Sequence, residues 1–127
     1  MNKNVLNKIL DNHKLWLQTN GEKGERADLR SADLSFADLR SADLSYANLR
    51  SADLSSADLD FSAFPLWCGG LDVHIDDIQA TQLLYHLIRN VKYSKNTSKE
   101  MKKLCMLKSI VKKANEFHRA KECGEIE

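Results

Sequence analysis

A five-residue period runs through the middle of this 127-residue chain and constrains its fold more than any other feature. From residue 27 the sequence repeats Ala-Asp-Leu followed by two further residues. Seven units are regular, and an eighth is degenerate, with Phe64 at the leucine place. The leucine place is otherwise filled by Leu29, Leu34, Leu39, Leu44, Leu49, Leu54 and Leu59.

The period of five fits neither the 3.6 residues of a helical turn nor the two-residue alternation of a flat strand. Alanine and leucine stand two residues apart in each unit, which places them on one face of an extended segment. The chain must therefore turn once per unit so that each new pair again faces inward. This pattern predicts a solenoid with short extended sides and leucine at its centre.

Residues 26–66 resemble the pentapeptide-repeat family, whose unit is a small residue, Asp or Asn, Leu or Phe, and two polar or small residues. The resemblance implies a right-handed quadrilateral β-helix with four units per coil, and hence two coils about 4.8 Å apart. The last place of the family's unit is often glycine. Here it holds Ser31, Phe36, Ser41, Tyr46, Ser51, Ser56 and Phe61.

Both flanks of the repeats predict helices that can cap the open ends of such an array. Residues 4–18 carry an apolar stripe typical of an amphipathic helix. A second helix is expected from Asp76 or Asp77 to about Tyr93, and a third from a capping-box sequence at residues 97–100 to about residue 121. The predicted fold class is therefore a mixed one: a quadrilateral β-helix solenoid (22–67) with an N-terminal helical cap (1–21) and a C-terminal α-helical hairpin (68–127).

Motifs of catalysis are missing: we find no nucleotide-binding glycine motif, nucleophile elbow or HExxH sequence. We therefore expect no enzymatic activity and no cofactor. The pairs Cys68 and His74, and His118 and Cys123, leave a zinc site open, although their spacing matches no known zinc motif. Three widely spaced cysteines, no long apolar run and no signal peptide lead us to expect a cytoplasmic protein without a membrane partner.

The formal net charge of +1 hides a segregation of charge along the chain. Residues 21–62 hold five basic and nine acidic residues, a net charge of −4. Residues 92–113 hold eight lysines and one acidic residue, a net charge of +7. The small sum therefore excludes neither an anionic nor a cationic binding surface.

The acidic repeats lead to the main functional hypothesis. Some pentapeptide-repeat proteins imitate duplex DNA and occupy the DNA-binding surface of type II topoisomerases. The resemblance implies a non-enzymatic inhibitor of this kind, a DNA mimic that engages a DNA-handling enzyme, as an anti-CRISPR, anti-restriction or topoisomerase-binding protein of a phage or mobile element. The predicted partner-binding residues are Asp28, Asp33, Asp38, Asp43, Asp53, Asp58 and Asp60, together with the aromatic residues Phe36 and Tyr46.

Three alternatives stay open at this point. Aspartate belongs to the repeat consensus, and Arg30, Arg40 and Arg50 interrupt the acidic series, so the chain can equally be a generic protein-interaction scaffold. The lysines of residues 92–113 can bind phosphates, although direct nucleic-acid binding is the less favoured hypothesis because lysine-rich helix faces are commonly only solvated. The C-terminal helices can also form a homodimer.

Overall fold

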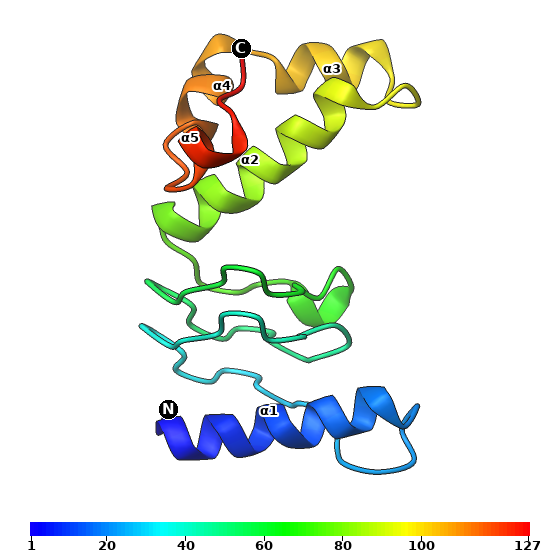
Figure 1. Cartoon of the computed structure of the whole chain (residues 1–127). Coiled ribbons are helices and arrows are strands. Elements are labelled where there is room, and N and C mark those ends of the chain that lie inside the picture. The colour runs from blue at the N-terminus through cyan, green and yellow to red at the C-terminus, as the bar shows by residue number, and fades with distance from the viewer. The chain divides into compact units, whose positions relative to one another are not determined.

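The computed structural model describes residues 1–127, which form two compact units, Met1–Asp76 and Asp77–Glu127. We call the first the repeat unit and the second the helical unit. The regular elements, in chain order, are α1 (Lys3–Gln18), the short 3-10 helix η1 (Cys68–Gly70), α2 (Asp77–Tyr93), α3 (Lys99–Cys105), α4 (Lys108–Ala114) and α5 (Ala120–Cys123) (Figure 1). None of these helices combines the length and the apolar character needed to cross a bilayer.

The predicted β-helix solenoid is wrong, because every regular element is a helix and the structure contains no strand or sheet. The repeats form turns joined by isolated parallel β-bridges, such as Asp28 with Asn48 and Asp33 with Asp53. Each repeat supplies only one bridging residue before the chain turns again. A strand needs consecutive paired residues, and the five-residue period leaves no room for them.

Each repeat turns at its last residue, which adopts a left-handed backbone conformation. The φ angle is 54° at Ser31, 58° at Phe36 and 62° at Tyr46, and it is positive at every fifth residue as far as Phe61. The leucine carbonyl accepts a hydrogen bond from the next repeat's alanine N–H, as Leu29 O does from Ala32 N at 3.1 Å. A positive φ at the third residue of a hydrogen-bonded turn defines the type II turn.

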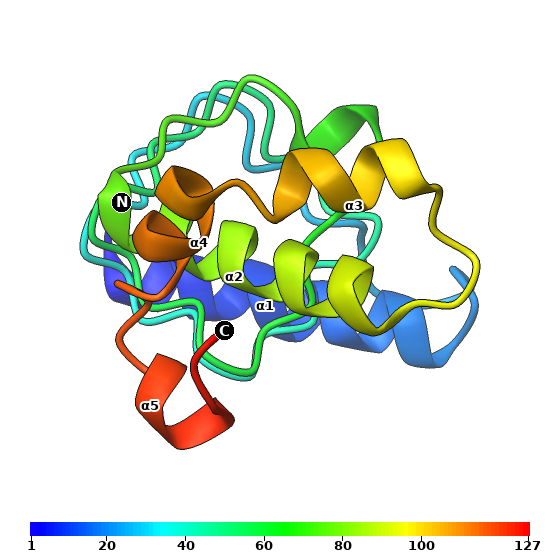
Figure 2. The ribbon, with the colours of Figure 1, turned by 90° about the horizontal axis from the view of Figure 1, so that it is seen from above.

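The repeats stack in register every twenty residues, so that residues 47–66 form a layer above residues 27–46. Leu29 N donates to Asn48 O at 2.8 Å, and Asn48 N donates to Ala27 O at 2.9 Å. Seen along the stacking direction, successive layers trace nearly the same outline (Figure 2). The leucines meet at the centre, where Leu29, Leu34, Leu39, Leu44, Leu49 and Leu54 are each at most 1% exposed.

Helix α1 packs across the first layer and confirms the helix that the apolar stripe predicts for residues 4–18. Its main polar attachment is His13, which is completely buried. The His13 Nδ1 accepts a hydrogen bond from Ala27 N at 3.1 Å, so the ring proton lies on Nε2, which donates to Ser45 O at 2.9 Å. One side chain thus satisfies two backbone groups at the open end of the stack.

The other end of the stack is covered by residues 64–76. Leu49 N donates to Gly69 O, Leu54 N donates to His74 O, and the indole Nε1 of Trp67 donates to Ala47 O at 3.0 Å. These bonds give the second layer backbone partners on its upper side. Gly69 is required here, because a Cβ at this residue would lie 2.2 Å from the Trp67 ring.

The helical unit differs from its sequence prediction in one respect. Helix α2 begins and ends where the sequence indicates, but the single helix expected up to about residue 121 is broken into α3, α4 and α5. Both α3 and α4 pack against α2, which one straight helix would not allow over its whole length (Figure 2). The side chain of Asn115, at the end of α4, exchanges two hydrogen bonds with the backbone of Ile126.

Candidate protein-binding surface of the repeats

The aspartate of each repeat first serves the fold. The Asp33 Oδ1 accepts a hydrogen bond from Ser35 N at 3.1 Å, and the same bond to the backbone two residues later recurs through the series. Asn48 makes it equally well, through its Oδ1 to Arg50 N at 3.2 Å. Side chains that bond their own backbone two residues on stabilise turns. The aspartate series therefore has a structural cause that is independent of any partner.

Residues twenty apart form four columns on the surface of the stack, and the columns differ in charge. The column of Asp28 and Asn48 is neutralised internally. Arg30 forms an ion pair with Asp28 at 2.6 Å, which lowers the pKa of that carboxyl through its hydrogen bonds. Arg50, in the layer above, pairs with Asp72 at 3.1 Å. Two arginines and two carboxylates thus leave this column without net charge.

The column of Asp38 and Asp58 keeps an excess of negative charge. Arg40 pairs with Asp38 at 2.8 Å and lies 3.6 Å from the Asp58 carboxylate of the next layer. The hydrogen bonds from Arg40 lower the pKa of Asp38 to about 2. Asp60 takes the place that arginine holds in the layer below. Three carboxylates therefore face one guanidinium, a net charge of −2.

The column of Asp33 and Asp53 carries no arginine. The two residues are bridge partners, so their carboxylates lie in adjacent layers about 4.8 Å apart. The hydroxyl of Ser35 lowers the pKa of Asp33, and that of Ser55 lowers the pKa of Asp53. Both carboxyls are ionised at neutral pH. Asp43, in the remaining column, has Ala63 as its bridge partner and stands without a second carboxylate in the layer above.

The negative charge therefore gathers on two neighbouring columns. We call these residues the acidic side of the repeats: Asp33, Asp53, Asp38, Asp58 and Asp60, with Arg40 among them. Asp76 adds a further carboxylate at the corner of these columns, where its Oδ2 accepts a hydrogen bond from Ser56 N at 2.7 Å. The sequence could not show this asymmetry, because it depends on which arginines and aspartates the stacking brings together.

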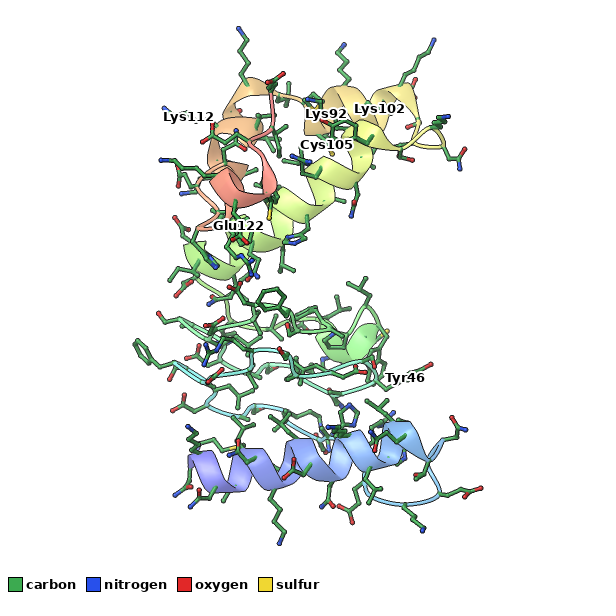
Figure 3. The ribbon with its side chains drawn as sticks, viewed as in Figure 1. Tyr46, Lys92, Lys102, Cys105, Lys112 and Glu122 are labelled. Atoms are coloured by element: carbon green, nitrogen blue, oxygen red, sulfur yellow. The ribbon has the colours of Figure 1, made fainter.

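Three aromatic side chains occupy corner positions of the stack. Phe36 is 80% exposed, Tyr46 is 62% exposed and Phe61 is 74% exposed. Tyr46 packs edge-on against Trp16 of α1, with ring centroids 6.0 Å apart (Figure 3). The sequence reasoning named Phe36 and Tyr46 and missed Phe61, although the same place in the repeat was the signal that marked all three.

A groove of about 540 Å³ separates α1 from the first layer of repeats. Lys3, Leu10 and Lys14 line it from the helix, and Asp38 and Arg40 line it from the repeats. The groove thus adjoins one column of the acidic side. It adds cationic and apolar groups next to the carboxylates.

The lysines of the helical unit lie mainly on α3 and α4. Figure 3 shows Lys102 on α3 and Lys112 on α4. Lys113 differs from its neighbours because it pairs with Asp77 at 2.8 Å and with Glu116 at 2.7 Å, which raises its pKa. The four residues considered for zinc are divided between the units: Cys68 and His74 belong to the repeat unit, and His118 and Cys123 belong to the helical unit. The structure shows no cluster of three or more metal-ligating side chains.

Comparison with known proteins supports the resemblance for the repeats alone. Residues 25–63 match the family model of pentapeptide repeats in eight copies. This match covers about a third of the chain and is typical of a segment used for protein interaction. Neither the curated proteins nor the solved structures gave a significant match.

Proposed function

We propose that the chain is a non-enzymatic protein-binding module that engages its partner through the acidic side of the repeats. The observation that carries the proposal is the uneven charge of the columns. One column is neutral because its arginines are paired, whereas the columns of Asp33 and Asp38 together keep a net charge of −4. A one-sided charge favours a basic partner surface and speeds encounter with it.

DNA mimicry is the finer form of this proposal. Ionised carboxylates that recur at layer spacing, as Asp33 and Asp53 do, present a periodic anionic surface of the kind that phosphates form on duplex DNA. The ion pairs of Arg30 and Arg50 limit such a surface to one side of the stack. An inhibitor of a DNA-handling enzyme would therefore present the acidic side to that enzyme.

The second candidate function is binding of a polyanion by the helical unit. It is favoured by Lys99, Lys102, Lys103, Lys108 and Lys112, for which the structure shows no ion pair, in contrast to Lys113. Free lysines release counterions when they meet phosphates, so such binding weakens steeply with salt.

One set of measurements tests these functions. The full chain is immobilised, and proteins retained from a lysate of its native cells are identified and purified. Their affinity is then measured for the triple variant Asp33→Asn, Asp53→Asn, Asp58→Asn. Asparagine keeps the bond to the backbone, as Asn48 shows, and removes only the charge. The matched control is Asp28→Asn with Asp43→Asn, outside the acidic side.

We expect the triple variant to weaken binding at least tenfold and the control to leave it within about twofold. Equal effects of the two variants, or none, would overturn the proposal. Duplex DNA added as a competitor separates the finer hypotheses. Displacement of the partner supports mimicry, and its persistence contradicts mimicry. Salt-sensitive binding of the duplex by the chain itself supports the lysine surface, and no binding at low salt rejects it.

A further inference from the structure

We infer that Phe36 and Phe61 are paired anchors that insert into two apolar pockets of a basic protein partner. The inference rests on the proposed function and names the residues that give it affinity. Both side chains stand at corners of the column formed by residues 37–41 and 57–61: Phe36 precedes it in the first layer, and Phe61 ends it in the second. The two rings thus flank Asp38, Arg40 and Asp58 diagonally.

Neither ring has a role in the packing of the stack. Phe36 is 80% exposed and Phe61 is 74% exposed, whereas a core aromatic would be buried. The equivalent aromatic Tyr46 does have a structural contact, since it packs against Trp16. Four other repeats place a serine at this corner without loss of the turn, at Ser31, Ser41, Ser51 and Ser56.

Phenylalanine is also an unfavourable choice for the backbone at these corners. The φ angles of 58° and 62° lie in the left-handed region, where a Cβ crowds the following carbonyl and bulky residues are uncommon. A residue that strains the turn and exposes apolar surface lowers stability twice. Such costs are typical of sites that serve binding, and aromatic side chains are the most frequent anchors of protein interfaces.

The charge between the two rings identifies the partner. Three carboxylates and one guanidinium lie there, so phosphate-rich nucleic acids and anionic membranes are repelled. A basic protein surface is attracted. Five residues of chain and one layer separate the corners, so the two apolar pockets of the partner lie within about 18 Å of each other.

The test uses serine, which the repeats themselves place at four equivalent corners. Phe36→Ser and Phe61→Ser are made singly and together in the full chain, with Ser51→Gly as a control at a corner of the neutral column. Binding of the partner purified as described above is measured by titration. We expect each phenylalanine variant to weaken binding about tenfold and the control to leave it unchanged, while thermal unfolding of the variants occurs at or above the wild-type temperature.

The outcomes separate this inference from the proposed function. Loss of binding in the triple aspartate variant together with full binding in the double phenylalanine variant would overturn the anchors and spare the acidic side. If no protein is retained in an aspartate-dependent manner, the proposed function fails and the anchors fail with it. Benzoylphenylalanine at position 36 or 61 should crosslink the same partner, and crosslinking equally strong from position 51 would contradict the assignment.

Discussion

The two units of the molecule reach their folds by different routes. In the repeat unit every fifth residue repeats one local solution: a buried leucine, a turn at positive φ, and an aspartate that bonds the backbone two residues on. The helical unit has no such repetition, and its helix ends depend on distant partners such as Asn115 with Ile126. A stack of identical small units is therefore sensitive to the loss of any one layer contact, whereas a helical core distributes its losses.

The largest expected effect comes from truncation of the leucine core. Leu49 is fully buried between the layers, and Leu49→Ala should destabilise the repeat unit by about 2–5 kcal/mol, because it leaves a cavity in a stack too small to collapse around it. Both tryptophans, Trp16 and Trp67, belong to the repeat unit, so their fluorescence during urea unfolding reports on that unit alone.

The matched truncation in the other unit is Ile88→Ala, at a residue that is also fully buried. It should leave the tryptophan transition in place and change hydrogen exchange only within residues 77–127. A shift of the tryptophan transition by Ile88→Ala would contradict the independence of the two units.

An intermediate effect is expected at the attachment of α1. His13→Ala removes both hydrogen bonds that the ring makes with Ala27 and Ser45, and it leaves two backbone groups without partners. We expect a loss of about 1–3 kcal/mol. Urea unfolding followed by tryptophan fluorescence measures it, and an unchanged midpoint would show that α1 is held by its apolar face alone.

The smallest effect per residue should come from acid, and it should distinguish the units. Hydrogen bonds lower the pKa of Asp28, Asp33, Asp38 and Asp53 in the folded repeat unit. Groups with a lowered pKa contribute stability above the unfolded pKa near 4 and lose it as the pH falls through the folded value, which is about 2 for Asp38. Each contribution is small because these carboxylates are exposed and screened.

The midpoint of the tryptophan transition should therefore fall steadily between pH 4 and pH 2. The helical unit has the opposite dependence at Lys113, whose raised pKa contributes stability that is lost only at strongly alkaline pH. A tryptophan midpoint that stays constant from pH 4 to pH 2 would refute the role of the aspartate bonds.

Several features of the fold followed from the sequence because they depend on neighbouring residues. The apolar stripe of residues 4–18 predicted α1, and the acidic start and apolar face predicted α2. The β-helix prediction failed because the family resemblance implied paired strands, whereas the short repeat permits only single bridges. The continuous helix after residue 97 failed because contact with α2 outweighed the helical pattern of the sequence.

The candidate surface was predictable in its residue types but not in its arrangement. The sequence alone determined the leucine core, the turn at each fifth residue and the aspartate series, because these repeat within five residues and obey local rules. Only the tertiary structure decided that Arg30 and Arg50 neutralise one column, that Tyr46 packs on Trp16, and that Phe36 and Phe61 flank the acidic side. Stacking every twenty residues makes neighbours of side chains that are distant in sequence, and charge and exposure depend on those neighbours.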